Sequence, residues 1–153
     1  AETAPNGDLH VSKFGTRLAG CGGLIDITQN AKKVCYCGTF TAKGLKVEVA
    51  DGKIKILQEG AKKKFVKEVE HITFSGIYAN KVHQPVLYIT ERAVFELRPE
   101  GVTLIEIAPG IDLQTQILDQ MEFEPKIAYQ EDGTIKLMDS RIFRDEIMGL
   151  AND

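Results

Sequence analysis

A loop rich in glycine is the feature of this sequence best suited to chemistry. Residues 15–23 hold four glycines, and Gly20, Gly22 and Gly23 stand just before a segment that could open a short helix. Glycine lets the backbone approach a ligand closely, and free N–H groups can bind an anion or the oxyanion of a carbonyl addition. The spacing fits neither the dinucleotide-binding fingerprint nor a phosphate-binding P-loop. A tight connection without a ligand is the alternative interpretation.

The cysteines and histidines offer less chemistry. Cys35 and Cys37 are two apart on an expected strand, so they share one face and are predicted to be small buried apolar side chains. Their spacing is not that of a redox or zinc C-x-x-C motif, and Cys21 has no histidine near it in sequence. The odd count of three cysteines predicts reduced thiols in a reducing compartment, the cytoplasm by default. The histidines are scattered, so no metal site is predicted: His10, His71 and His83.

Two charged clusters each admit two interpretations. Glu91-Arg92 follows an almost wholly apolar strand. It could be catalytic, because open α/β sheets gather their sites at the carboxyl ends of strands, but a buried ion pair is the simpler explanation. The lysine run 62–64 is predicted to be a solvated face, with contact to a phosphate-bearing ligand as the alternative.

These residues must be positioned by a strand-rich α/β chain. Apolar and alternating runs predict strands, and Asp51-Gly52 is typical of a tight hairpin turn. Asp112 is a plausible N-cap for a helix over about 112–121. The pattern weakens over about 125–153, which is predicted to be a C-terminal extension laid on the body. Strands are expected at 9–13, 34–41, 45–49, 53–57, 72–74, 86–90, 93–97 and 102–107, and a short helix from residue 24.

Length and composition limit the possible classes of function. At 153 residues the chain suits one domain, 1–153. Hydrophobic residues make up 43% and charged residues 27%, which is typical of a globular chain rather than a disordered one. The net charge of −3 argues against binding of a nucleic-acid backbone. No apolar run approaches the ~20 residues that span a bilayer, and the N-terminus does not resemble a signal peptide.

Four segments carry more specific information: VSKFG at 11–15, GCGGLIDI at 20–27, ITERAVF at 89–95 and LIEIAPGI at 104–111. Together they closely resemble the C-terminal part of class I coenzyme A transferases, and most of all the single-chain acetate/propionate branch. The resemblance covers about residues 9–150, and it implies an open α/β sheet of the CoA-transferase and sugar-phosphate isomerase type. The family's nucleophile is a glutamate in an upstream Glu-Asn-Gly or Glu-Ser-Gly motif. No glutamate of this sequence is followed by either dipeptide, so the chain resembles the C-terminal portion of one domain.

The resemblance also implies a reaction, in which the intact protein moves CoA from a short-chain acyl-CoA to a carboxylate through a glutamyl–CoA thioester. Gly20, Gly22 and Gly23 would line the CoA thioester and the oxyanion position, and no catalytic residue would lie in this chain, which is predicted to be inactive alone. CoA is a substrate, and neither a metal nor a further cofactor is needed. The implied partners are acyl-CoA, a short-chain carboxylate, the missing N-terminal portion or a partner chain, and further copies in a homo-oligomer, without nucleic acid or membrane.

Two other classes of protein stay open on the sequence. One is a non-catalytic acyl-CoA-binding domain. The other is a sugar-phosphate isomerase-like enzyme on the same fold, although such an enzyme needs a positioned base, and none is obvious near the glycine loop.

Overall fold

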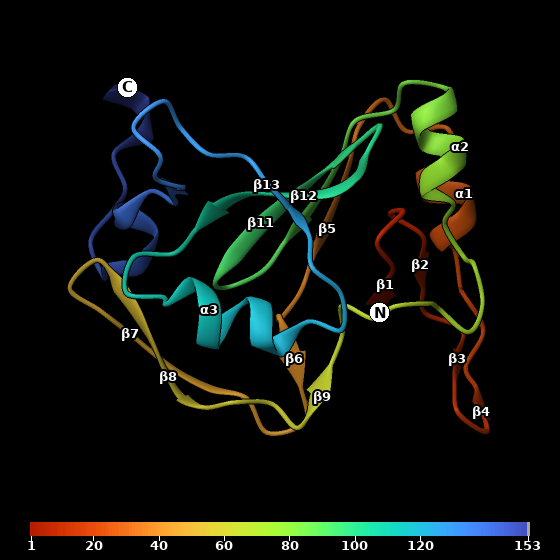
Figure 1. Cartoon of the computed structure of the whole chain (residues 1–153), viewed down its shortest axis with the longest axis horizontal. Helices are drawn as coiled ribbons and strands as arrows, with labels where there is room; N and C mark the ends of the chain where they lie inside the picture. The colour runs from red at the N-terminus through yellow and green to blue at the C-terminus, as the bar shows by residue number, and fades with distance from the viewer. Residues whose placement is uncertain (153) are drawn as a thin grey trace.

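A mixed six-stranded sheet forms the centre of the molecule (Figure 1). The computed structural model describes residues 1–152. The strands are β5 (Val34–Cys37), β10 (Val86–Ile89), β11 (Ala93–Arg98), β12 (Gly101–Ile107), β13 (Lys126–Ile127) and β14 (Lys136–Leu137). Their order is β13-β12-β11-β10-β5, with β14 also paired to β12. β5 is parallel to β10, the β10–β11–β12 meander is antiparallel, and β13 and β14 are parallel to β12. The predicted α/β class is confirmed.

The meander carries the hydrophobic core. Phe95 and Leu104 are fully buried and lie opposite each other in the register of β11 and β12. The ring centroid of Phe65 lies 4.7 Å from that of Phe95 and 5.0 Å from that of Phe40, which is also fully buried. Aromatic pairs at such separations add to the stability that burial itself provides. This cluster holds the loops around residues 40 and 65 against the sheet.

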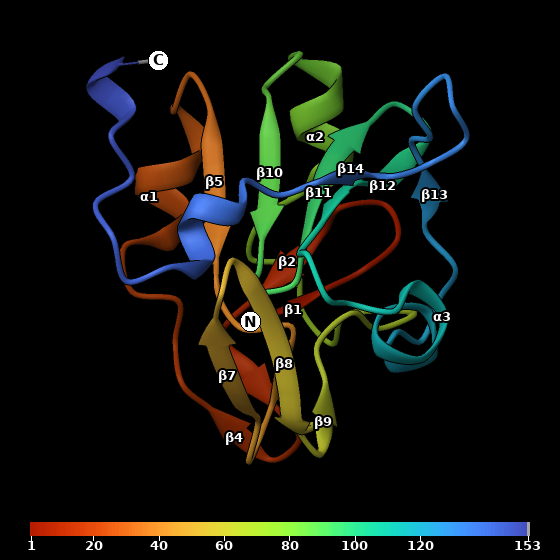
Figure 2. The same cartoon turned by 90° about the vertical axis from the view of Figure 1, so that its left-hand side faces the viewer.

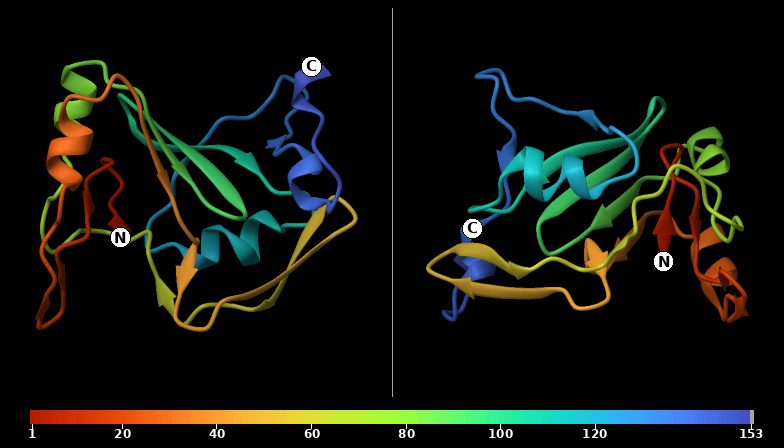
Figure 3. Two further views of the ribbon diagram at one scale, coloured as in Figure 1. Left: turned by 180° about the vertical axis from the view of Figure 1, so that it is seen from behind. Right: turned by 60° about the horizontal axis from the view of Figure 1, so that its bottom comes forward.

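Two short helices lie side by side at one end of the molecule (Figures 1 and 3). α1 (Leu24–Gln29) precedes β5, and α2 (Gly76–Lys81) precedes β10. The Ser75 hydroxyl caps α2 by accepting a hydrogen bond from the N–H of Tyr78, at 3.2 Å. The Gln84 amide donates to the carbonyls of Thr28 and Ala31, at 2.8 Å each, and so ties the end of α1 to the segment after α2.

The predicted hairpin is confirmed. β7 (Lys46–Ala50) pairs with β8 (Lys53–Gln58), and the two strands lie together apart from the central sheet (Figure 2). Both turn residues have positive φ, 54° at Asp51 and 76° at Gly52. A two-residue turn with this conformation matches the twist of the strands, and Asp-Gly is a preferred sequence for it.

Three small antiparallel pairs surround the sheet. They are β1 (Glu2–Thr3) with β2 (Leu9–His10), β3 (Lys13–Phe14) with β4 (Arg17–Leu18), and β6 (Thr41–Ala42) with β9 (Lys62–Lys63). The strand expected at 9–13 is therefore two strands, and the one expected at 34–41 ends at Cys37. The segment 72–74, expected as a strand, forms only an isolated bridge between Leu9 and Phe74.

The helix predicted in the C-terminal third of the chain is shorter than expected. The helix expected over 112–121 is α3 (Leu113–Gln116) followed by the 3₁₀ turn η1 (Leu118–Gln120). Asp112 is its N-cap as predicted, since its carboxylate accepts a hydrogen bond from the N–H of Thr115 at 2.8 Å. In the C-terminal region, β13 and β14 extend the central sheet, and the 3₁₀ turns η2 (Ser140–Phe143) and η3 (Leu150–Asn152) follow. No helix within residues 1–152 is long and apolar enough to cross a membrane.

The burial predicted for two cysteines is wrong. Cys35 and Cys37 do share one face of β5, but both are exposed, whereas Val34 on the opposite face is buried. β5 is an edge strand of the sheet, and the described residues leave both cysteine side chains largely open to solvent. All three cysteines are free thiols in the structure.

Candidate functional site

The glycine loop, residues 15–23, is exposed over most of its length and runs from the β3–β4 hairpin into α1. Gly20 and Gly22 have positive φ, 72° and 55°, which explains why these positions hold glycine. A Cβ at either residue would meet no atom within 4 Å. Gly23 has a φ of −85° and is the N-cap residue of α1. The backbone N–H groups of these three glycines have no hydrogen-bond partner within residues 1–152.

The unpaired N–H groups of the glycine loop are available to bind a ligand. Backbone N–H groups without a partner can bind a carbonyl oxygen that is gaining negative charge. Within residues 1–152, no acid or base side chain accepts a hydrogen bond from the N–H of Gly20, Gly22 or Gly23. The carboxylate that contacts the loop is Glu70, which accepts from the N–H of Gly15 at 3.2 Å and pairs with Lys13 at 3.8 Å.

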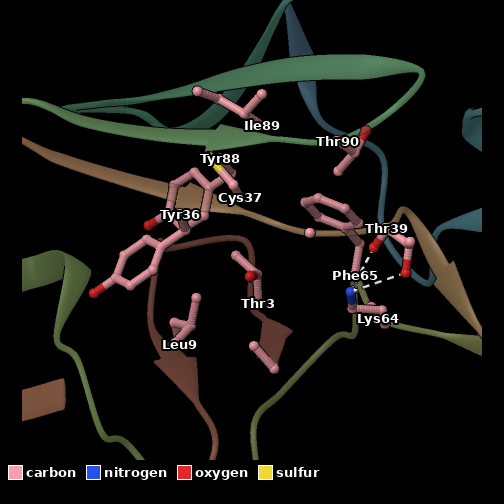
Figure 4. A pocket seen from close by; sticks show the side chains of 12 residues that line it. Thr3, Leu9, Tyr36, Cys37, Thr39, Lys64, Phe65, Tyr88, Ile89 and Thr90 are labelled. Atoms are coloured by element: carbon pink, nitrogen blue, oxygen red, sulfur yellow. Dashed lines mark hydrogen bonds between the residues drawn. The ribbon is translucent and has the colours of Figure 1, made fainter. Parts of the chain in front are cut away.

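A small cavity lies at the carboxyl ends of the parallel strands β5 and β10 (Figure 4). Its volume is about 60 Å³, and its walls include Cys37, Thr39, Phe65 and Thr90. The Lys64 ammonium borders it and donates to the carbonyl oxygen of Thr39. Burial lowers the pKa of Lys64. In open α/β sheets ligands bind outside the carboxyl ends of the strands, so this cavity occupies a position suited to a small group.

The lysine run is not the solvated face that the sequence predicted. Lys62 pairs with the carboxylate of Glu2 at 2.7 Å, and its ammonium lies 4.8 Å from the ring centroid of Phe14. Lys63 donates to the carbonyl of Asp119 at 2.7 Å. The run therefore joins β9 to three separate segments, because the flexible stems of lysine reach acceptors beyond the strand.

Glu91-Arg92 forms a buried ion-pair network, as the simpler interpretation predicted. Arg92 is fully buried, and its guanidinium donates to Glu59 at 2.6 and 3.0 Å, to Glu91 at 2.7 Å and to the carbonyl of Gln116 at 3.1 Å. Glu91 also accepts from the N–H of Phe40 at 2.8 Å. The network joins the ends of β8, β10 and α3 to the loop after β5. Glu91 therefore accepts hydrogen bonds from Arg92 and Phe40 and is not a free carboxylate.

Sequence reasoning missed Glu59, which lies 33 positions from Arg92. Its carboxylate also accepts from the Thr41 hydroxyl at 2.5 Å. A neighbouring glycine is required here, because a Cβ at Gly60 would lie 2.5 Å from the carbonyl oxygen of Ala42. The only indication of Glu59 in the sequence was indirect. A buried guanidinium needs hydrogen-bond acceptors for all of its donors, and these acceptors must come from other parts of the chain.

The Glu59 carboxylate is expected to make the stability of the fold depend on pH. Burial raises its pKa, but the hydrogen bonds from Arg92 and Thr41 outweigh burial and place it below its ordinary value of 4.5. A carboxyl group with a depressed pKa stabilises the fold above its unfolded-state pKa, and this contribution is lost as the pH falls through the folded-state pKa. Glu59→Gln should therefore be less stable than the unaltered protein near neutral pH, and this difference should shrink below about pH 4.5. Denaturant midpoints of both proteins from about pH 7 to about pH 3 measure it; a difference that stays constant would contradict the assignment.

His10 is fully buried and lies beside a carboxylate. Its Nε2 lies 2.9 Å from the Glu2 carboxylate, and burial lowers its pKa. Within residues 1–152, no group of three or more histidine, cysteine or acidic side chains could hold a metal ion.

Comparison with curated proteins decides the family. Over 99% of its length the chain is 52% identical to acetate CoA-transferase YdiF of Escherichia coli O157:H7, and 51% identical to YdiF of E. coli K12. It is 50% identical over 98% of its length to caffeate CoA-transferase of Acetobacterium woodii. The chain belongs to the CoA-transferase family. It spans 28–29% of the length of these relatives, and no protein-family model matches it.

Solved structures agree with this CoA-transferase assignment. A crystal structure of the E. coli O157:H7 acyl-CoA transferase YdiF, in a thioester complex with CoA, matches with a TM-score of 0.92 and 52% identity. The match covers 97% of this chain and 28% of that one. The decarboxylase AibA/AibB matches with a TM-score of 0.59 at 17% identity, over 90% of this chain and 47% of that one, which indicates a shared fold alone.

Proposed function

We propose that this chain is the C-terminal portion of an acyl-CoA:carboxylate CoA-transferase acting on short-chain acyl groups. The observation that carries the proposal is 52% identity to acetate CoA-transferase YdiF along 99% of the chain. The glycine loop supports it, because its free N–H groups suit a reaction in which carbonyl oxygens gain charge. CoA would be the substrate, with no metal or further cofactor.

The proposed reaction proceeds by acyl exchange on a glutamate outside this chain. The glutamate carboxylate attacks the acyl-CoA thioester, forms a mixed anhydride and expels CoA thiolate. The thiolate attacks the glutamyl carbonyl and displaces the acyl group as a free carboxylate, which leaves a glutamyl–CoA thioester. A second carboxylate attacks this thioester, and the same steps in reverse release a new acyl-CoA.

Each of these steps passes through a tetrahedral adduct with a negatively charged oxygen. We assign Gly20, Gly22 and Gly23 to the CoA thioester and to this oxygen. Their contribution would be electrostatic, through N–H groups that have no hydrogen-bond partner within residues 1–152. The remaining partners would be a short-chain carboxylate, the polypeptide that supplies the glutamate, and further copies in a homo-oligomer in the cytoplasm.

The two alternative functions are less well supported. A sugar-phosphate isomerase needs a free base close to its phosphate-binding N–H groups, but Glu70 beside the glycine loop is already paired with Lys13 and the N–H of Gly15. A non-catalytic acyl-CoA-binding domain would use the same loop without a nucleophile, but the curated relatives that match this chain are CoA-transferases.

The 153-residue chain alone is expected neither to transfer CoA between acetyl-CoA and another short carboxylate nor to form a covalent CoA adduct. The reason is that no glutamate of this sequence is followed by Asn-Gly or Ser-Gly, the motif of the family's nucleophile. Glu91, which follows an apolar strand, is held by Arg92 and the N–H of Phe40 and is not free to attack. The measurement is turnover, together with borohydride trapping and mass spectrometry, with the intact protein as positive control. Adduct on the intact protein and none on the chain is the expected result. No adduct on the intact protein would contradict the proposed function, and turnover by the pure chain would place a nucleophile within it.

A further inference from the structure

The hairpin of β7 and β8 has one open edge (Figure 2). All five residues of β7 are exposed, and β8 is its only partner strand within residues 1–152. The other edge of the hairpin is tied to the body, because the N–H of Ile54 on β8 donates to the carbonyl of Pro109 at 3.0 Å. An open edge carries unpaired N–H and C=O groups, which can pair with a strand of another chain.

The register of the hairpin shows which backbone groups point out of the open edge. Val49 lies opposite Ile54. Since the N–H of Ile54 is directed away from β7, these two residues exchange no hydrogen bonds, and the N–H and C=O of Val49 point outward. Val47 lies two residues earlier on the same strand and has the same orientation. Val47 and Val49 therefore offer two donors and two acceptors to an incoming strand.

The side chains of β7 form an apolar face and a charged face. Val47 and Val49 are 38% and 47% exposed, whereas Ile54, which lies opposite Val49, is only 2% exposed. The apolar face of the hairpin therefore extends past the core that covers β8. Lys46 and Glu48 lie on the charged face, and neither forms an ion pair within residues 1–152.

We propose that β7 pairs with β7 of a second copy of the protein, antiparallel and about a twofold axis at Val47. Apolar side chains then meet on one face, where Val47 lies opposite its own copy and Leu45 lies opposite Val49. On the other face each Lys46 lies opposite a Glu48, and opposite charges at such positions stabilise a sheet. The proposed function includes a homo-oligomer. This pairing assigns one surface to it and does not depend on the reaction.

Other registers of the same two strands are less favourable. A twofold axis at Lys46 or at Glu48 would place that charge opposite its own copy, and like charges directly opposite are destabilising. An axis between residues, on either side of Val47, would place a valine opposite a charged side chain. A twofold axis also closes the assembly, so that no further edge of this kind is left open. The sequence of β7 therefore favours one register and one partner, which is a second copy of itself.

Disulfide cross-linking of the intact protein tests this pairing. Its native cysteines, which include Cys21, Cys35 and Cys37, are replaced by serine, so an introduced cysteine can be joined only to its counterpart in another copy. Two Val47→Cys positions would have Cα atoms about 5.5 Å apart, which a disulfide can bridge. Two Val49→Cys positions would lie about 13 Å apart along the strands, which is too far. We expect mild oxidation to form a covalent dimer several-fold faster with Val47→Cys, although Val49 is the more exposed.

Charge reversal in the Val47→Cys background identifies the register. Lys46→Glu and Glu48→Lys should each slow dimer formation several-fold, because each places like charges opposite one another. The two reversals together restore opposite charges and should restore the rate, which damage to the fold would not do. Equal cross-linking at residues 47 and 49, no dimer at residue 47, or single reversals without effect would each overturn the proposal. No readout uses CoA, so an inactive protein that still cross-links at residue 47 would contradict the proposed function alone.

Discussion

Gly22→Val in the intact protein is expected to slow the chemical step by about 10²–10³-fold, which is the loss that follows removal of one oxyanion donor. Gly22 has a φ of 55°, a conformation that β-branched valine resists. The loop would have to change its backbone conformation, which would move its N–H groups away from the proposed position of the carbonyl oxygen. A valine side chain would also occupy the open space above the loop, where the thioester carbonyl is proposed to lie.

A matched control separates this effect from backbone strain. Gly133 also has positive φ, 81°, and a Cβ there also meets no atom within 4 Å. Gly133→Val should therefore carry a similar folding cost, about 1–3 kcal/mol for an unfavourable backbone conformation. Only Gly22→Val should lose turnover and trap little glutamyl–CoA adduct with borohydride. Unchanged turnover in Gly22→Val would show that the glycine loop is a connection between elements and that its assignment is wrong.

The elements of this fold that could be predicted are those whose pattern is local. The Asp51-Gly52 turn and the strands of the meander follow from adjacent residues, and the structure confirms them. Asp112 was recognisable as an N-cap, but the helix behind it ends at Gln116, because Ile117 has a φ of −124° and is fully buried. Apolar spacing alone cannot distinguish a continuous helix from two short turns on the same surface.

What could not be predicted depends on contacts between distant segments. The exposure of Cys35 and Cys37 depends on which face of the sheet other elements cover, and the sequence of one strand does not contain that information. The lysine run found acceptors in Glu2, Thr39 and Asp119, far away in sequence. In the glycine loop, residue type permits the positive φ of Gly20 and Gly22, but Gly23 has a negative φ, so glycine content indicated an unusual backbone without fixing its conformation or its ligand.

Arg92→Leu is expected to be the most destabilising single change in the chain, at about 3–5 kcal/mol, because it leaves buried carboxylates without their cation. Arg92 is completely buried and spans Glu59 and Glu91 at once. Leucine would satisfy neither carboxylate, and it would leave the carbonyl of Gln116 without its donor. For a chain of this size the melting temperature should fall by on the order of 10 °C. Lysine at this position keeps the charge but lacks the planar fork of donors, so Arg92→Lys should be intermediate.

Arg98→Leu provides the control for loss of an arginine charge. Arg98 pairs with Glu96 at 2.8 Å, but its side chain is 39% exposed, and surface pairs contribute about 0–1 kcal/mol. Denaturant unfolding followed by circular dichroism compares the three variants with the unaltered protein. A loss in Arg92→Leu no larger than in Arg98→Leu would contradict the structural role of the network. A large loss confined to Arg92 would mean that the loop after β5, and with it the carboxyl ends of the parallel strands, is held in place by this one guanidinium.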